Sequence, residues 1–288
     1  MAVRNSFKDY MALSKPSITA LSVLMCAAGL WLAGNVDLLT VLWTLIGTAL
    51  AVASANALNM YLERDVDALM ERTANRPLPA GRMKPGPALI FGIVTGGLSL
   101  LVLAAGTNLL TTLLGALALL GYVAIYTPLK RRSPLALVVG AVPGAMPPLM
   151  GWTAATGQLD APGLVLFGVL FIWQMPHFLA IAIRRKEQYS RAGIQIVPVV
   201  RGNQIAKIQA LSYATALVPM SLMLVSLGVA GWIYMVTSLA VGGWYLWSTA
   251  EGLKNNSNEG QWAKRVFTVS LFYLPIWMVG LCLDKTLL

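Results

Sequence analysis

Apolar segments of about 20 residues alternate with short polar segments along the whole chain. A helix of that length spans the hydrocarbon core of a bilayer. We predict nine such helices, at residues 17–33, 38–60, 87–105, 109–127, 135–156, 162–183, 206–228, 231–250 and 264–283. The pattern therefore predicts an all-α polytopic membrane protein in which residues 1–288 form a single domain.

The connections between these helices differ on the two sides of the predicted bundle. On one side they are short turns rich in Gly, Asn and Asp, such as residues 34–37 and 106–108. On the other side, residues 61–86 and 184–207 form two long connections. Short turns favour antiparallel neighbours, whereas functional residues concentrate in long loops. We therefore expect the two long loops to carry the function.

The basic residues lie almost entirely on the side of the long loops. Charged residues make up 11% of the chain and its mean hydropathy is +0.70, whereas a soluble domain is about a quarter charged. Of the 21 Lys and Arg residues, only Lys285 falls on the other side. The positive-inside rule then places the N-terminal segment 1–16 and both loops in the cytoplasm, and the C-terminus outside. The net charge of +10 does not indicate nucleic-acid binding, because these loops are short and have no interleaved aromatic residues.

An acidic stripe lies where the second predicted helix reaches the cytoplasmic side. Asn59, Glu63 and Asp67 are spaced i, i+4 and i+8, so they share one helix face. An amide and two carboxylates are hard oxygen ligands for Mg²⁺, which takes phosphate oxygens at its other positions. The alternative is a solvated helix end with the carboxylates paired to Arg64 and Arg72. We favour a Mg²⁺ site, because ionisable groups at a membrane boundary are costly.

Basic and hydroxyl groups follow on the same side. Arg72 and Arg76 precede a proline-stiffened segment, and arginine recognises phosphate through paired hydrogen bonds. Tyr126 and Lys130 end the fourth helix and offer a hydroxyl and an ammonium to a leaving phosphate. The alternatives are a cluster that only sets the topology, and side chains that extend to the membrane surface.

The second long loop and the helix before it hold further candidates. Glu187, next to Gln188, is surrounded by cations that include Lys186 and Arg191, so it either completes a second Mg²⁺ site or forms a salt bridge. His177 follows a proline in an apolar helix, where a structural histidine is commoner than a ligand of a metalloporphyrin or a proton carrier. Trp173 either stabilises a cation in an apolar cavity or packs in the core.

These segments resemble a known family. The stretch from Asn59 through Glu63-Arg-Asp-Val-Asp67 to Arg72-Thr-Ala-Asn-Arg76-Pro-Leu-Pro79 resembles the first acidic motif of the UbiA-type intramembrane prenyltransferases. Tyr126 and Lys130 match the family's Tyr-x-x-x-Lys element. Trp173-Gln-Met-Pro-His-Phe178, with the segment from Tyr189 to Pro198, is similar to the second motif of the heme O synthase branch.

The resemblance implies an architecture and an activity. It implies nine helices around a central cavity that opens to the cytoplasm, capped by the two long loops, in the bacterial inner membrane. It also implies Mg²⁺-dependent transfer of farnesyl from farnesyl diphosphate to a vinyl group of heme b, with addition of water to give heme O. The implied partners are both substrates and the lipid bilayer. Contact with heme A synthase or with oxidase assembly proteins stays open.

Carried over residue by residue, the resemblance implies roles at the site. Asn59, Glu63 and Asp67 would hold Mg²⁺ on the diphosphate, and the groups that would bind the diphosphate or help it leave are Arg72, Arg76, Tyr126, Lys130 and Lys186. The family has Asp immediately before the second-motif tyrosine, where this chain has Gln188. An amide brings no charge to a second metal, and Glu187 is the nearest carboxylate that could replace it.

Two other functions fit parts of the pattern. One is a prenyltransferase that acts on a quinone precursor or another aromatic acceptor, against which the Trp173–Phe178 segment argues. The other is a non-catalytic carrier of heme or of lipid diphosphates, whose polar residues would line a path open to both faces of the membrane. The polar residues of this chain gather on one face, which favours a one-sided reaction chamber.

Overall fold

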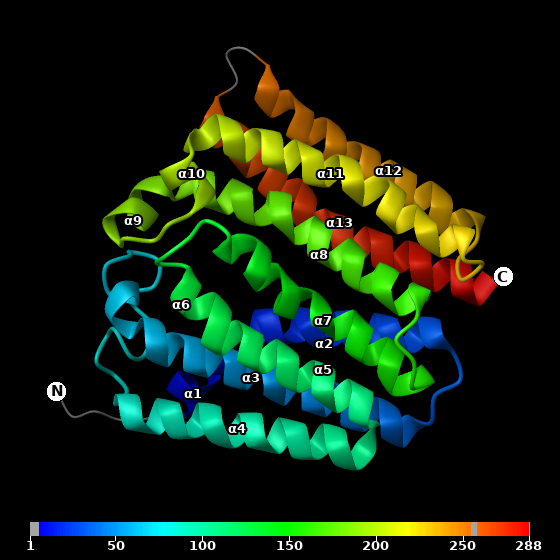
Figure 1. The fold of residues 1–288 in the computed structure, drawn as a ribbon, viewed down its shortest axis with the longest axis horizontal. Helices are drawn as coiled ribbons and strands as arrows, with labels where there is room; N and C mark the ends of the chain where they lie inside the picture. Colours follow the sequence, from blue (N-terminus) through cyan, green and yellow to red (C-terminus); the bar gives the residue numbers. More distant parts are fainter. Residues whose placement is uncertain (1–5, 255–257, 288) are drawn as a thin grey trace.

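The protein is a bundle of long helices. The computed structural model describes residues 6–254 and 258–287, and all regular secondary structure in these ranges is helical. The long helices run side by side across the molecule, with the short helices α9 and α10 at one end (Figure 1). The predicted all-α class is confirmed.

Each predicted apolar segment lies in a long helical stretch. These stretches are α2 (Pro16–Ala33), α3 (Leu38–Asp67), α4 (Pro85–Gly106), α5 (Leu109–Leu120) continued by the π-helical turn η1 (Gly121–Tyr126) and α6 (Thr127–Leu129), α7 (Ala136–Thr156), α8 (Ala161–Arg184), α11 (Gly202–Ser226), α12 (Trp232–Ala250) and α13 (Glu259–Leu287). Eight stretches in the described part of the chain are long and apolar enough to cross a membrane. The exception is α12, whose Trp, Tyr and hydroxyl side chains lower its mean hydropathy, so a ninth crossing stays a prediction.

The two long connections contain more helix than the apolar pattern indicates. Helix α3 continues to Asp67, past the predicted boundary at residue 60, so the stripe of Asn59, Glu63 and Asp67 lies within one helix. Residues 68–84 then fold as successive turns. The second connection contains α9 (Lys186–Arg191) and α10 (Val197–Val200) and ends in the first turn of α11.

Small residues bring the helices of the first half into close contact. Helix α2 packs along α7, and α3 packs along α4. A Cβ atom built on Gly29 would lie 2.1 Å from the carbonyl oxygen of Pro148, and one built on Gly151 would lie 2.0 Å from that of Cys26. Close backbone approach through small residues is a common way for helices to associate in lipid. These two glycines therefore set the distance between α2 and α7.

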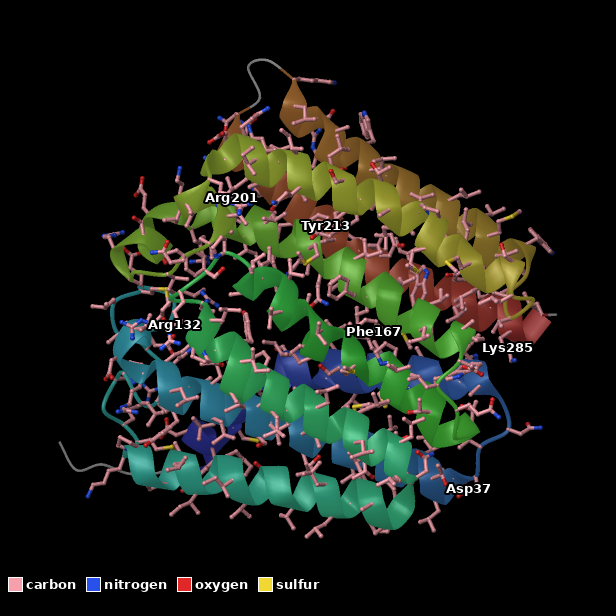
Figure 2. All side chains as sticks on the ribbon, in the orientation of Figure 1. Asp37, Arg132, Phe167, Arg201, Tyr213 and Lys285 are labelled. Atoms are coloured by element: carbon pink, nitrogen blue, oxygen red, sulfur yellow. The ribbon has the colours of Figure 1, made fainter. Side chains whose placement is uncertain are left out.

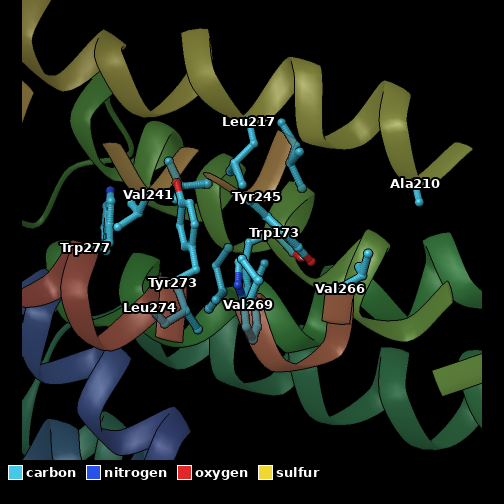
Figure 3. Close-up of a cluster of buried hydrophobic side chains, with 14 of the residues drawn as sticks. Trp173, Ala210, Leu217, Val241, Tyr245, Val266, Val269, Tyr273, Leu274 and Trp277 are labelled. Atoms are coloured by element: carbon cyan, nitrogen blue, oxygen red, sulfur yellow. The ribbon is translucent and has the colours of Figure 1, made fainter. Parts of the chain in front are cut away.

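The largest apolar core lies in the second half, between α8, α11, α12 and α13. Trp173, Tyr245, Tyr273 and Trp277 gather there around Leu217 and Val269 (Figure 3). Several polar atoms of these rings are hydrogen-bonded: Trp277 Nε1 donates to Tyr234 Oη at 2.9 Å, and Tyr245 Oη donates to the Trp173 carbonyl at 3.3 Å. Such bonds satisfy polar groups that lipid cannot.

The charged residues separate along the bundle. Arg132 and Arg201 lie at one end and Asp37 and Lys285 at the other (Figure 2). Helix α1 (Phe7–Ser14) packs against α3, and with residues 68–84, α6 and residues 184–201 it forms what we call the cationic end. Helix α13 ends on the opposite side, at the label C (Figure 1).

Candidate functional site

A cavity of about 270 Å³ opens at the cationic end, between α2, α3, η1, α7, α8 and the second long connection. The polar side chains that line it are Lys15, Asn59, Glu63, Asp67, Arg72, Arg76, Tyr122, Tyr126, Lys130, Tyr189 and Gln195. They come from both halves of the chain, and the backbone N–H of Gln195 donates to the carbonyl of Lys130 at 2.9 Å. The tertiary fold therefore joins the two predicted loops around one cavity.

The acidic stripe forms one wall of this cavity, as the helical spacing predicts. Asn59 and Asp67 are buried, and Glu63 is 14% exposed. Asn59 Nδ2 donates to Glu63 Oε2 at 2.8 Å and to Thr127 Oγ1 at 3.2 Å. These bonds use the amide nitrogen of Asn59, so its Oδ1, which Lys15 Nζ approaches to 3.5 Å, is the atom that would ligate a metal.

Each carboxylate of the stripe pairs with a cation that also lines the cavity. Arg76 donates to Asp67 Oδ2 at 2.6 Å, and Lys130 Nζ lies 2.9 Å from Glu63 Oε1. The alternative expected these carboxylates to be ion-paired, and they are, but not with Arg64 and Arg72. Arg64 instead contacts the exposed Asp65 at 3.8 Å. The partners are Arg76, nine residues beyond Asp67, and Lys130, directly after α6, and sequence spacing does not reveal these pairings.

Lys15 also lines the cavity, although the sequence pattern does not single it out among the basic residues of the N-terminal segment. Its Nζ lies 3.5 Å from Asn59 Oδ1. Burial, together with the positive charges of Arg76 and Lys130, lowers the pKa of Lys15 to about 7. The signal in the sequence was a lysine placed directly before the proline that begins the first long helix.

The aromatic side of the cavity comes from the π-helical turn. Tyr126 packs under the ammonium of Lys130, which lies 4.4 Å from the ring centroid, and Tyr122 lies 5.0 Å from Tyr126 between centroids. Tyr122 was not among the predicted site residues. A π-helical turn shifts the register of a helix, and such turns are frequent at functional sites.

The second loop contributes Tyr189 and residues 194–196 to the cavity. Lys186, Glu187, Gln188 and Arg191 are not among its lining residues, and Gln188 Nε2 donates to Glu71 Oε2 at 3.3 Å near the surface. No group of three or more His, Cys, Asp or Glu residues within 6–254 and 258–287 is arranged to hold a metal. The roles of these four residues stay predictions.

Trp173 and His177 lie against α13. Trp173 Nε1 donates to the Ser270 carbonyl at 3.1 Å, and His177 Nδ1 lies 2.6 Å from Ser270 Oγ. The two rings stack with centroids 5.3 Å apart. These contacts are those of packing residues, whereas the neighbouring Phe178 lines the cavity. Binding of a substrate by Trp173 or His177 stays a prediction.

A smaller apolar pocket of about 100 Å³ adjoins the polar cavity, and the two share Ile18 and Tyr122. Its other walls include Val52, Leu119 and Met150. The site thus combines a charged head region at the cationic end with an apolar region deeper in the bundle. This arrangement suits a phosphate-bearing amphiphile.

The donor set fits Mg²⁺. Asn59 Oδ1 and the carboxylates of Glu63 and Asp67 are hard oxygen ligands on one face, and Mg²⁺ commonly takes one or two carboxylates plus substrate phosphates. The cavity is lined by four cations, Lys15, Arg72, Arg76 and Lys130, but by only two carboxylates. This excess of positive charge favours an anionic ligand that the metal and the cations bind together.

Long apolar helices around a charge-lined cavity fit an intramembrane enzyme, and comparison with known proteins identifies its family. The model of the UbiA prenyltransferase family matches residues 21–272. The chain therefore belongs to the UbiA prenyltransferase family and is a membrane-embedded prenyltransferase.

Relatives and solved structures agree with this assignment. The protoheme IX farnesyltransferase of Myxococcus xanthus is 47% identical over 96% of this chain and 94% of its own, and that of Gloeobacter violaceus is 41% identical over 98% and 93%. A digeranylgeranylglyceryl phosphate synthase has the same fold, with a TM-score of 0.83 and 17% identity over 98% of this chain and 99% of its own. A UbiA homolog from Archaeoglobus fulgidus bound to GPP and Mg²⁺ has a TM-score of 0.70 and 19% identity over 95% and 99%.

Proposed function

We propose that this protein transfers the farnesyl group of farnesyl diphosphate to a vinyl group of heme b, with addition of water, to give heme O. The observation that carries the reaction class is the stripe of Asn59, Glu63 and Asp67, faced by cations above an apolar pocket. The choice of substrates rests on the names of relatives that share 40 to 48% of aligned residues with this chain.

The polar head of the site would ionise the diphosphate. Mg²⁺, held by Asn59, Glu63 and Asp67, would stabilise the negative charge that develops on the leaving oxygens. Arg72, Arg76 and Lys130 line the same cavity and would bind the remaining phosphate oxygens. The C–O bond then breaks with its electron pair on the diphosphate, which these groups hold in place.

The apolar part of the site would protect the allylic cation. Aliphatic side chains such as Val52 and Leu119 keep water from the prenyl chain, and the faces of Tyr122 and Tyr126 stabilise positive charge nearby. The vinyl carbon of the acceptor attacks the cation. Water then adds to the new cation on the porphyrin side chain and releases a proton.

The placement in the membrane follows from the charge distribution. We propose that the cationic end faces the cytoplasm of the bacterial inner membrane, with nine crossings and the C-terminus outside. Residues 61–86 and 184–207 then cap the cavity from the cytoplasmic side. Heme A synthase, or an oxidase assembly protein, would be the next partner of the product.

The test is the mass of the heme after incubation. Purified protein in detergent is given heme b, farnesyl diphosphate and Mg²⁺, with EDTA replacing Mg²⁺ in the control. We expect a Mg²⁺-dependent gain of one farnesyl group plus one water. Unchanged heme, with Mg²⁺-dependent binding of farnesyl diphosphate intact, would overturn the acceptor and favour a quinone precursor. Failure to bind either heme b or farnesyl diphosphate would overturn the enzyme mechanism and favour the carrier.

A further inference from the structure

We propose that Lys15, at the junction of α1 and α2, binds the diphosphate of the prenyl substrate and holds it after the C–O bond breaks. The inference rests on the proposed function and adds a group from outside the acidic and basic motifs. The ammonium donates hydrogen bonds and keeps its protons, while the electron pair of the broken bond stays on the diphosphate.

The backbone at Lys15 is the first observation. Its φ of 46° makes it the only residue other than glycine with a positive φ in the ranges 6–254 and 258–287. It is both the C-cap of α1 and the N-cap of α2, and α2 begins at Pro16. A side chain with a Cβ is strained in this conformation, which glycine or asparagine adopts more easily. Strain of this kind is found where function requires a particular side chain.

The direction of the side chain is the second observation. The kink between α1 and α2 turns Lys15 into the cavity, where its Nζ reaches Asn59 Oδ1 at 3.5 Å. Asn59 is one of the three candidate metal ligands. A diphosphate held by that metal would therefore lie within reach of the ammonium.

The third observation is that Lys15 has no carboxylate partner among the described ion pairs, although Glu63 and Asp67 lie near it. Of the three other cations that line the cavity, Arg76 pairs with Asp67 and Lys130 pairs with Glu63. The described ion pairs include none to Lys15, and its hydrogen-bond acceptor, Asn59, is a neutral amide. A largely enclosed ammonium next to two other cations is costly unless an anion joins it. An anionic substrate would supply that anion.

The competing explanation is structural, with Lys15 serving only to orient the Asn59 amide and to cap α2. The two explanations differ for Lys15→Asn. Asparagine removes the ammonium but adopts the left-handed conformation with less strain, so a binding role predicts weaker diphosphate binding together with equal or higher thermal stability. A structural role predicts that diphosphate binding and thermal stability decline together.

The experiment measures the affinity of inorganic pyrophosphate in the presence of Mg²⁺, by calorimetry on the full chain in detergent, beside the thermal unfolding midpoint. The variants are Lys15→Asn, Lys15→Met and the control Lys8→Met, which removes the same charge from the exposed face of α1. We expect Lys15→Asn and Lys15→Met to bind pyrophosphate about 10- to 100-fold more weakly, as for loss of a charge-assisted hydrogen bond. Lys8→Met should bind like the unmodified protein.

Three results would overturn the proposal. Unchanged affinity in Lys15→Asn would remove Lys15 from the diphosphate site and leave the proposed function standing. Parallel loss of folding and binding in both Lys15 variants would show that the side chain is structural. Absence of pyrophosphate binding by the unmodified protein would overturn this proposal and the proposed function together.

Discussion

At the scale of single residues, the acidic stripe is compatible both with ion-paired carboxylates and with a Mg²⁺ site. Asp67 pairs with Arg76 and Glu63 pairs with Lys130, so the carboxylates are neutralised in the structure as it stands. All four side chains nevertheless line the cavity. When Mg²⁺ and a diphosphate bind, the carboxylates can turn to the metal and the cations to the phosphate oxygens. Under the proposed function, the ion pairs would therefore hold in place the groups that bind the metal and the diphosphate.

Replacement of Asp67 tests this arrangement. Asp67→Ala removes a metal ligand and leaves Arg76 without its partner, so we expect turnover to fall by a factor of at least about 10² and some stability to be lost. Asp67→Asn keeps an oxygen in place and should fold normally while losing most activity. The control is Asp65→Ala, two residues away on α3, whose side chain is 86% exposed. Steady-state turnover and the unfolding midpoint are measured, and an active Asp67→Ala would remove the metal assignment.

Replacement of Gln188 tests the departure from the family pattern. The Gln188 side chain donates to Glu71 at an exposed position, where a hydrogen bond contributes little to stability. We expect Gln188→Asp to keep activity within about twofold, since an exposed change of this kind is usually tolerated. Initial rates at several Mg²⁺ concentrations provide the check, with Gln188→Ala for comparison. An inactive Gln188→Asp would show that the amide itself has a specific role.

At the scale of elements, the spacing of helices depends on a few glycines and on one irregular turn. Gly29 and Gly151 allow α2 and α7 to approach until backbone meets backbone. On the other side of the apolar pocket, η1 places Tyr122 and Tyr126 on the cavity side of the fourth long stretch. The pocket lies between these elements, so its width is set by helix packing rather than by any loop.

A methyl group at the α2–α7 contact should therefore be destabilising. Gly151→Ala places a Cβ against the Cys26 carbonyl, and overpacking of this kind costs about 1 to 3 kcal/mol. Gly97→Ala is the matched control, because Gly97 lies in α4 with no atom within 4 Å of the added Cβ. There alanine should be neutral or stabilising, since it is the better helix former. Thermal unfolding in detergent compares the two, and equal midpoints would contradict the close contact.

At the scale of the whole molecule, the positive charge and the candidate site lie at the same end. The cationic end carries the cavity, α1 and both long connections, whereas the opposite end has short turns. At a membrane surface, a site can reach both the polar head of a membrane-embedded substrate and Mg²⁺ from the aqueous phase. Under the proposed function, this one end would both orient the protein in the membrane and bind the diphosphate.

The orientation can be tested with single cysteines. In a background with Cys26 and Cys282 replaced by alanine, we expect Gln158→Cys to react with a membrane-impermeant maleimide in intact cells, because it lies in an exposed turn at the end opposite the cavity. Ser190→Cys, exposed at the cationic end, should react only after the membrane is opened. The reverse pattern would place the cavity outside the cytoplasm.

The sequence alone determined the features that depend on local spacing. Apolar segments of bilayer length predict helices, because in lipid every backbone polar group must be bonded within its own segment. The stripe of Asn59, Glu63 and Asp67 was also predictable, because the periodicity of a helix fixes which residues share a face. The resemblance of the motifs to the UbiA family added the fold and the expected reaction.

Only the tertiary structure decided which residues meet across the bundle. It paired Asp67 with Arg76 and Glu63 with Lys130, brought Lys15 and Tyr122 into the cavity, and placed Trp173 and His177 against Ser270 of α13. The hydrogen bond of Trp173 to Ser270 alone joins residues 97 positions apart. These contacts depend on how whole helices pack and where the chain kinks, and no spacing along the sequence encodes those distances.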